Sequence, residues 1–397
     1  MTSFSKKRIL VISALDIWSM GQKKGAPSLL RTIKNFAEHG WKVFFLTGNK
    51  KKDSVYDIHP NIRIIRFNSS WLNINAFFGR SIWWLYFQIL AFFIGYRISR
   101  KEKIDFFYGY EVQGIPVSKV LSKIFKKPII SRFQGTKLSA HLQEKFWKIK
   151  YWDDVFAMKI PVDLLIMAND GTMGDKVLRK INAKTKKVKF WLNGVDKNIY
   201  IPNFDKNNFK KELKIEKNKK ILLAISRLEK WKRVDRIIKT MSRVLKAESE
   251  TELLIIGDGK EKENLEKLVK ELKVENGTRF LGALPHDELK KYYNLADIFI
   301  STYDISNVGN PLLEALSCGK CIVTLDIGDT DKFIHNEKNG ILVKLDKINI
   351  LPDIIIKLLK DNEKRKRLEE NAKEFAKNNL WTWKERMETE FDEVRKL

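Results

Sequence analysis

The chain has 397 residues, 44% of them hydrophobic and 31% charged, a balance that argues against wholesale disorder and against a protein with many membrane spans. Its length exceeds what one hydrophobic core usually supports, so we expect two domains. The 76 Lys and Arg against 49 Asp and Glu give a formal net charge of +27, which favours polyanions or an anionic membrane surface as partners. Nucleic acid is not expected, because the sequence has no zinc-finger spacing, RNA-recognition signature or heptad-backed basic region.

The first expected element lies near the N-terminus. Lys6, Lys7 and Arg8, followed by apolar residues, superficially look like the beginning of an export signal, but Asp16 ends the apolar run too soon. We therefore expect a buried strand at residues 9–13 and a cytoplasmic protein.

Short apolar runs rich in Ile, Val and Phe alternate with longer amphipathic stretches, the pattern of a parallel sheet covered by helices. In the first half these runs are residues 9–13, 43–46, 62–65, 106–108, 129–131 and 164–167. In the second half they are residues 221–225, 253–256, 278–281, 298–301 and 321–325. The fold class is therefore α/β, with two doubly wound, Rossmann-like domains. Each binding edge should lie at the carboxyl ends of the strands, and the crevice between the domains is the expected active site.

The domain boundary is expected where the turn-like sequence from Asn193 to Asp196 leads into a polar, lysine-rich stretch. Residues 1–196 then form the N-terminal domain and residues 197–380 the C-terminal domain. Residues 381–397 should form a last helix that packs back on the N-terminal domain.

The segment from Trp71 to Tyr96 is almost wholly apolar and strongly aromatic. Its uninterrupted apolar part is shorter than the ~20 residues that a membrane span requires, which argues against a transmembrane helix. Two interpretations stay open. The segment is either a buried helix before the strand at residues 106–108, or a helix that lies in a bilayer interface, which its Trp and Tyr residues and the basic residues after it favour.

Two loops of the second half carry candidate ligand-binding residues. Arg227 and Lys232 follow the strand at residues 221–225, where a guanidinium and an ammonium group can hold a diphosphate, although a solvated basic loop has the same spacing. Gly257 and Gly259 follow the next strand, and they permit a tight turn and close approach of the backbone to a ligand. The first βα turn lacks G-x-G-x-x-G, which argues against a dehydrogenase.

The segment after the strand at residues 298–301 is the richest in candidate ligand-binding residues. Gly309, Asn310 and Pro311 predict a loop that enters a helix, where backbone amides favour an anionic group. Glu314 follows one turn later. Its carboxylate could accept hydrogen bonds from two vicinal hydroxyls, or it could be an ordinary acid in a first helical turn.

Cysteines and histidines do not indicate metal or redox chemistry. Cys318 and Cys321 have the spacing of a redox motif but lie among apolar residues, so we expect them to pack as small side chains. His141 and His286 have no second His or Cys at metal-binding spacing, and no metal site is expected.

Taken together, these motifs resemble glycosyltransferase family 4, whose members have the GT-B fold. The resemblance rests on motifs that occur in order along the second half and its lead-in: residues 193–196, Arg227 with Lys232, residues 257–259, 282–289 and 310–315. The N-terminal match is thinner, and there Gly25 and the helix and strand after it are similar to the family's glycine loop.

The resemblance implies transfer of a sugar from a nucleoside-diphosphate sugar to a glycan or lipid-linked acceptor, with retention of configuration and with no cofactor or divalent metal. It implies an acceptor-binding N-terminal domain and a donor-binding C-terminal domain. Arg227 and Lys232 would be the catalytic cations on the diphosphate, and Glu314 would bind the ribose. The other implied donor-side residues are Gly257, Gly259, Ser306, Gly309 and Asn310, and those on the acceptor side or cleft are Gly25, Gln134, Gly135 and Asn193. Cell-surface polysaccharide or glycolipid synthesis at the inner face of the cell membrane is the implied role.

Two positions depart from the family pattern. The family usually has two glutamates separated by seven residues, and the first falls at Ser306, which has no carboxylate. Asp304 could substitute, or the donor sugar could be bound differently. Gln134 stands where many members have a histidine. The alternative function is therefore a catalytically silent GT-B protein that binds a nucleotide sugar or supports a partner transferase.

Overall fold

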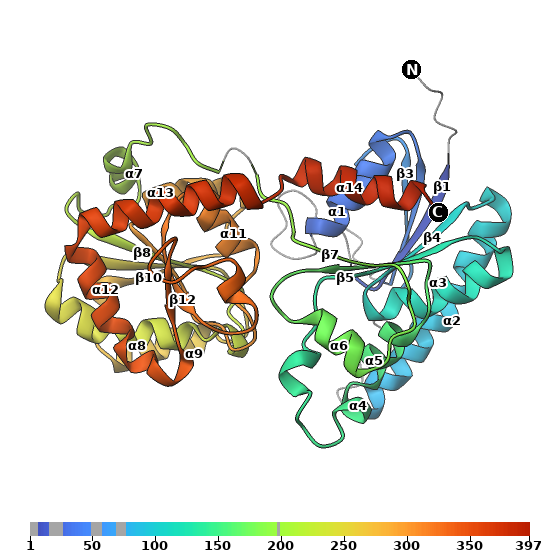
Figure 1. The fold of residues 1–397 in the computed structure, drawn as a ribbon, viewed down its shortest axis with the longest axis horizontal. Coiled ribbons are helices and arrows are strands. Elements are labelled where there is room, and N and C mark those ends of the chain that lie inside the picture. Colours follow the sequence, from blue (N-terminus) through green and yellow to red (C-terminus); the bar gives the residue numbers. More distant parts are fainter. Residues whose placement is uncertain (1–6, 16–26, 49–57, 69–76, 197–198) are drawn as a thin grey trace. The chain divides into compact units, whose positions relative to one another are not determined.

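The computed structural model describes residues 7–15, 27–48, 58–68, 77–196 and 199–397. The chain divides into two units (Figure 1). Unit 1 is Met1–Asn169, Met173–Asn193 and Trp383–Leu397, and unit 2 is Asp170–Thr172 and Gly194–Thr382. Unit 2 thus takes its main stretch from Gly194, close to the boundary expected after Asp196, and it also takes a three-residue segment from the first half of the chain.

Unit 1 is built on a parallel seven-stranded sheet in the order β3-β2-β1-β4-β5-β6-β7. Every apolar run predicted in the first half forms one of its strands. The strands are β1 (Arg8–Ser13), β2 (Lys42–Thr47), β3 (Ile62–Arg66), β4 (Phe106–Tyr110), β5 (Ile129–Phe133), β6 (Leu164–Ala168) and β7 (Val188–Trp191). The sequence did not reveal β7, because this edge strand is short, half-buried and interrupted by a lysine.

Helices cover both faces of this sheet. They are α1 (Pro27–Glu38), α2 (Phe77–Glu102), α3 (Glu111–Phe125), α4 (Trp147–Lys150), α5 (Trp152–Lys159), α6 (Gly174–Lys180) and α14 (Trp383–Arg395). Alternate side chains of β1 point to opposite faces, as period-two strand geometry requires. Leu10 and Ile12 join the core under α2 and α3, whereas Ile9 and Val11 join the core under α1 and α14.

Helix α14 is held in unit 1 by a buried charge cluster. The carboxylate of Glu390 pairs with Arg132 and, at 2.8 Å, with Arg386, and it accepts a hydrogen bond of 2.5 Å from the hydroxyl of Tyr108. The two arginine charges keep the pKa of Glu390 low despite its burial. The last helix therefore belongs to the first unit, although the chain reaches it from the second.

Unit 2 contains a parallel six-stranded sheet in the order β10-β9-β8-β11-β12-β13. Its strands are β8 (Lys220–Ile225), β9 (Thr251–Ile256), β10 (Thr278–Gly282), β11 (Ile298–Ser301), β12 (Cys321–Leu325) and β13 (Ile341–Val343). Its helices are α7 (Lys206–Glu212), α8 (Val234–Ala247), α9 (Lys262–Glu271), α10 (His286–Leu295), α11 (Asn310–Ser317), α12 (Leu351–Lys360) and α13 (Asn362–Asn379). All predicted strands of this half are present, and the three-residue edge strand β13 is additional.

Cys318 and Cys321 pack as small buried side chains, as predicted. Cys318 follows α11, and Cys321 opens β12. Burial raises the pKa of the Cys318 thiol to about 11 and that of Cys321 to about 12. Both thiols are therefore protonated at neutral pH, the opposite of what a reactive cysteine requires.

The aromatic segment from Trp71 to Tyr96 forms much of α2, with residues 71–76 outside the described part. Phe87 and Ala91 are buried against the sheet, but Leu85 and Phe93 are exposed. The buried-helix interpretation therefore holds for only one face. Among the described residues, the stretch Ser81–Glu102 is long and apolar enough to span a membrane, a criterion of length and composition that a core helix also meets.

Candidate functional site

The candidate site lies at the point in the unit 2 sheet where the strand order reverses. From β8 the chain moves outward through β9 and β10, and then returns to add β11 on the other side of β8. Strands β8 and β11 are parallel neighbours, so the loops after them leave from the same edge. Open α/β sheets bind ligands at such a switch point, beside the carboxyl ends of the strands. Arg227 and Lys232 follow β8, and Ser306, Gly309 and Asn310 follow β11.

The two motif glycines shape the loop that carries Arg227. A Cβ atom added to Gly257 would lie 1.8 Å from the backbone oxygen of Ser226, and one added to Gly259 would lie 2.3 Å from the oxygen of Leu228. Gly257 also has a φ of +141°, which favours glycine. The sequence analysis expected these glycines to let the backbone approach a ligand. In the structure the close approach is to the loop after β8, so the glycines position Arg227.

The two cations of this loop have different surroundings. Arg227 is exposed, and its guanidinium group has no hydrogen-bond or ion-pair partner among the described residues. Lys232 ends a short 3-10 turn, and its Nζ lies 3.9 Å from the ring centre of Trp231 and 3.6 Å from that of Tyr303. The Tyr303 hydroxyl donates to the backbone oxygen of Ile225 at 3.0 Å, which fixes this ring at the end of β8. Arg227 is thus available to an anion, and Lys232 is held by cation–π contacts.

The half-buried side chains of Lys232 and Asp170 interact electrostatically, and the charge of Arg227 also acts on Lys232. The pKa of Lys232 is lowered to about 7, mainly by burial and also by the charge of Arg227, while the charge of Asp170 opposes this shift. Burial also raises the pKa of Asp170 to about 6, against the hydrogen bonds from Thr172 and the charge of Lys232. Both groups therefore change their charge near neutral pH. The sequence analysis did not identify Asp170, because this residue comes from the segment between β6 and α6.

Ser306 is buried against the same segment. Its hydroxyl donates to the backbone oxygen of Asp170 at 2.7 Å and accepts from the amide of Val308 at 3.1 Å. Gly171 leaves little room, since a Cβ atom added there would lie 2.3 Å from Ser306 Oγ. Residues 170–172 therefore occupy the space into which a longer side chain at position 306 would extend.

Asp304, the suggested substitute for the missing glutamate, is engaged elsewhere. Its carboxylate lies 2.8 Å from Arg236 and 3.4 Å from Arg233. Its backbone amide donates to the oxygen of Trp231 at 2.9 Å. These bonds hold Asp304 toward α8. Asp170 is the acidic side chain that shares a charge interaction with Lys232.

The predicted helix start at Gly309 and Asn310 is present. Gly309 is the N-cap of α11, Asn310 is its first residue and Pro311 lies in its first turn. The amide of Gly309 donates to the oxygen of Asn307 at 2.8 Å, and its own oxygen accepts from Leu312 and Leu313. A ligand contact by the Gly309 amide would therefore have to replace an existing bond, contrary to the expectation of a free donor.

Glu314 is a buried carboxylate with one hydrogen-bond partner on each of its two oxygens. His286 Nε2 lies 2.9 Å from one oxygen, and the Tyr293 hydroxyl donates to the other at 2.9 Å. His286 also lies 3.6 Å from the carboxylate of Asp196. The sequence analysis gave His286 no role in the site. The signal for it in the sequence is the family-like stretch at residues 282–289, which contains His286 at the start of α10.

The acceptor-side residues belong to unit 1. Gln134 follows β5, and its backbone N–H donates to the carboxylate of Glu111 at 2.6 Å. Gly135 has a φ of +112°, a conformation that favours glycine. Asn193 follows β7 and is half-buried. Gly25 lies outside the described residues.

No metal-binding cluster occurs in the described ranges, because they contain no group of three or more His, Cys, Asp or Glu side chains placed to hold an ion.

Comparisons with known proteins match part of the chain to a family model. Residues 205–375 match the family model of glycosyl transferases group 1. The chain is 27% identical to the uncharacterized glycosyltransferase MJ1069 of Methanocaldococcus jannaschii over 377 residues, which cover 89% of this chain and 90% of the relative. It is 30% identical over 182 residues to N-acetyl-alpha-D-glucosaminyl L-malate synthase of Bacillus anthracis, covering 46% of this chain but only 47% of that enzyme.

The fold of the whole chain is similar to a solved structure. Anabaena Alr3699/HepE, determined in complex with UDP-glucose, superimposes with a TM-score of 0.75 at 17% sequence identity, and the match covers 98% of this chain and 100% of that one. At this identity the likeness shows the fold. Residues 205–375 of unit 2 therefore match the glycosyl transferases group 1, and the two units have the two Rossmann-like domains of the GT-B fold.

Proposed function

We propose that the protein is a retaining, metal-independent glycosyltransferase that moves a sugar from a nucleoside-diphosphate sugar to a glycan or lipid-linked acceptor. The observation that carries this proposal is the pair of cations, Arg227 and Lys232, at the switch point of the unit 2 sheet. The side chain of Arg227 is exposed there without a partner among the described residues, and the half-buried Lys232 is close enough for the two charges to interact. A diphosphate is the anion that two adjacent cations of this kind would bind best.

The charge state of Lys232 suggests how the pair assists the reaction. When the bond between sugar and phosphate breaks, negative charge develops on the leaving diphosphate. A diphosphate beside Lys232 favours the protonated amine, whose pKa is about 7 without ligand. The lysine would then be charged throughout the reaction, and Arg227 would add a bidentate contact. Two fixed cations can supply the stabilisation that a divalent metal gives in other transferases.

Glu314 is the proposed ribose-binding residue. His286 and Tyr293 orient its carboxylate, and each of its oxygens keeps a lone pair that can accept a further hydrogen bond. Two vicinal hydroxyls of a ribose match two carboxylate oxygens. The backbone at Asn310, in the first turn of α11, would lie near the phosphate or sugar.

Asp170 is the proposed carboxylate for the donor sugar. Ser306 cannot supply one, and Asp304 is paired with Arg233 and Arg236. One Asp170 oxygen accepts from the Thr172 amide and hydroxyl, at 3.2 and 2.5 Å. The other oxygen has no hydrogen-bond partner among the described residues. A sugar bound next to the diphosphate would meet this group close to Lys232.

The acceptor belongs on unit 1, and cell-surface polysaccharide or glycolipid synthesis at the inner face of the cell membrane is the proposed role. Gln134 and Gly135, at the carboxyl end of β5, are the proposed acceptor-side residues. The apolar outer face of α2 supports an acceptor that is presented at a lipid surface.

The test is a thermal-shift screen of the full chain against UDP, GDP, ADP and their sugars. A ligand that binds only the folded state raises the melting temperature, and one of these nucleotides should do so. The stabilising nucleotide sugar is then incubated with membrane extract, and the anomeric configuration of the product is read by NMR. Retention without added metal supports the proposal. Binding without hydrolysis or transfer to any acceptor would favour the catalytically silent alternative, and the absence of nucleotide binding would contradict both.

A further inference from the structure

The outward face of α2 carries an apolar stripe. Ile82, Leu85, Ile89 and Phe93 are 46%, 55%, 46% and 61% exposed. Their spacing of three or four residues places them on one face of the helix. A surface helix normally presents polar residues on that face. This stripe (Ile82, Leu85, Ile89 and Phe93) is therefore an exposed apolar surface, which indicates an interaction site.

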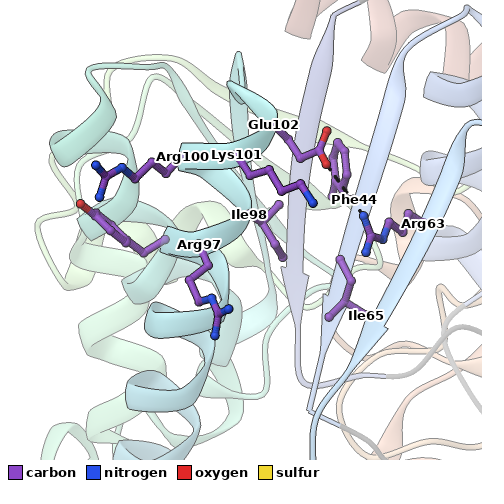
Figure 2. A pocket seen from close by; sticks show the side chains of 9 residues that line it. Phe44, Arg63, Ile65, Arg97, Ile98, Arg100, Lys101 and Glu102 are labelled. Atoms are coloured by element: carbon purple, nitrogen blue, oxygen red, sulfur yellow. Dashed lines mark ion pairs between the residues drawn. The ribbon is translucent and has the colours of Figure 1, made fainter.

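The stripe continues into basic residues at the end of α2. Arg97, Arg100 and Lys101 are exposed, and among the described residues none of them has an ion-pair partner. They border a hollow of about 470 Å³ between the last turns of α2, strand β2 and the edge strand β3. Figure 2 shows Lys101 and Arg63 directed into the space between helix and strands, with Arg97 and Arg100 pointing to other sides of the helix.

The hollow itself combines a positive rim with apolar walls. Phe44, Ile65 and Ile98 line it together with the four basic side chains, and Glu102 is its acidic residue. Glu102 lies 3.8 Å from Arg63, so part of that charge is balanced within the hollow. A phosphate group attached to an apolar body matches this combination.

A second exposed apolar surface, the tip formed by Phe146 and Ile149, lies at α4. Phe146 and Ile149, at α4, are each 65% exposed and alternate with Lys145, Lys148 and Lys150. Helix α5 follows α4 directly and contacts α2, because the ring of Trp84 lies 5.1 Å from Trp152 and 6.0 Å from Phe156. The stripe and this tip therefore belong to adjacent elements of unit 1.

We propose that the stripe on α2 and the tip at Phe146 and Ile149 dock on an anionic lipid bilayer, with the hollow beside Lys101 receiving a lipid phosphate. Apolar side chains flanked by lysine and arginine suit the boundary between acyl chains and anionic headgroups. A protein partner fits less well, since protein interfaces are depleted in lysine. The inference extends the proposed function, because a docked unit 1 would meet a lipid-linked acceptor in its own membrane.

The helix lies on the bilayer and does not cross it. Its opposite face is part of the core of unit 1, where Phe87 and Ala91 are fully buried. Gly95 packs closely against α3, since a Cβ atom added there would lie 2.7 Å from Leu121. Moving α2 into a transmembrane position would expose this core to solvent.

The experiment measures binding of the full chain to vesicles of phosphatidylcholine with and without phosphatidylglycerol. Wild type should bind the anionic vesicles and bind pure phosphatidylcholine at least tenfold more weakly. Substituting the stripe (Leu85→Gln with Phe93→Gln) or the basic end (Arg97→Gln, Arg100→Gln and Lys101→Gln) should each lower the affinity about tenfold or more. The control is the triple change Lys366→Gln, Arg367→Gln and Lys377→Gln on α13, which removes the same charge from exposed positions in unit 2. An equal loss of vesicle affinity in the control variant would overturn the proposal of a specific docking surface.

Insertion is tested separately. Phe93→Cys labelled with an environment-sensitive fluorophore should shift to shorter wavelength on anionic vesicles, and Cys318 and Cys321 are buried and should not react. An unchanged spectrum would contradict the proposal. The proposal would also be contradicted if the protein formed a dimer without lipid and the stripe substitutions abolished that dimer but left vesicle binding unchanged. Nucleotide binding in solution is measured on the same variants. If they keep it but lose vesicle binding, the docking surface is supported. If wild type binds vesicles but no nucleotide, the proposed function fails and the docking inference stands.

Discussion

The hydroxyl of Ser306 donates a hydrogen bond of 2.7 Å to the backbone oxygen of Asp170, a residue 136 positions earlier in the chain. Gly171 packs against the same hydroxyl, because a Cβ atom added there would lie 2.3 Å from it. This contact occupies the position that the resemblance assigns to the first of two family glutamates, and it brings Asp170 into the site of unit 2.

Introducing the family's glutamate should therefore harm this protein. Ser306→Glu would force the larger side chain against residues 170–172 and should destabilise the fold by about 2 kcal/mol, without raising turnover. Ser306→Ala, which removes only the hydrogen bond, should cost about 1 kcal/mol. Urea unfolding and a transfer assay measure both effects. A stable Ser306→Glu protein with higher turnover would show that the site has room for the carboxylate.

Asp170→Asn should separate binding of the sugar from binding of the nucleotide. If Asp170 accepts hydrogen bonds from the donor sugar, affinity for the nucleotide sugar should fall about tenfold, which corresponds to one hydrogen bond to a charged group. Affinity for the free nucleoside diphosphate should change less. Asp304→Asn is the matched control, since Asp304 pairs with Arg236 at 2.8 Å and should leave this difference unchanged. Calorimetric titration of each ligand gives the comparison, and an equal response of the two variants would rule out the assigned role.

Nucleotide affinity should decrease as the pH rises above 7. The pKa of Lys232 is lowered to about 7, mainly by burial, so the free protein loses this charge above that pH. A bound diphosphate favours the charged amine and raises its pKa, so binding takes up a proton between pH 7 and the raised pKa. The affinity should fall by up to about tenfold per pH unit in this window. Titration at pH 8 in buffers of different ionisation enthalpy should show the uptake, and Lys232→Arg should abolish it. Uptake that persists in Lys232→Arg would assign the proton to another group.

Glu314→Gln should weaken binding of ribonucleotides but not of nucleotides without ribose hydroxyls. An amide offers one acceptor where the carboxylate offers two, and its NH₂ group would face the Tyr293 hydroxyl and His286, which supply hydrogen bonds to the carboxylate. Affinity for a ribonucleoside diphosphate should fall about tenfold, and affinity for the 2′,3′-dideoxy analogue should stay nearly constant. An equal loss for both ligands would indicate a structural role for Glu314.

The sequence was sufficient to predict the elements that have a strong hydrophobic pattern. The strands at residues 298–301 and 321–325 have the predicted bounds, since apolar runs between amphipathic stretches indicate buried parallel strands. Arg227 could be placed at the binding edge because it follows such a strand. Strands β7 and β13 were missed, because four- and three-residue edge strands give too short an apolar run.

Contacts between distant segments could not be predicted. Asp170 meets Ser306, and His286 meets Glu314, only through folding, and no spacing motif connects either pair. The same limit applies to α2. Its sequence is apolar around the whole helix, so periodicity could not show that Phe87 faces the core and Phe93 the solvent.

The central claim is that Arg227 and Lys232 hold and neutralise the diphosphate. The most direct measurement is the affinity of the double variant Arg227→Ala and Lys232→Ala for the nucleoside diphosphate that stabilises the wild type, together with its rate of sugar transfer. Two charge-assisted contacts predict a loss of affinity of at least about a hundredfold and a larger loss of transfer, with a melting temperature near that of the wild type. A double variant that binds and transfers as well as the wild type would contradict the account.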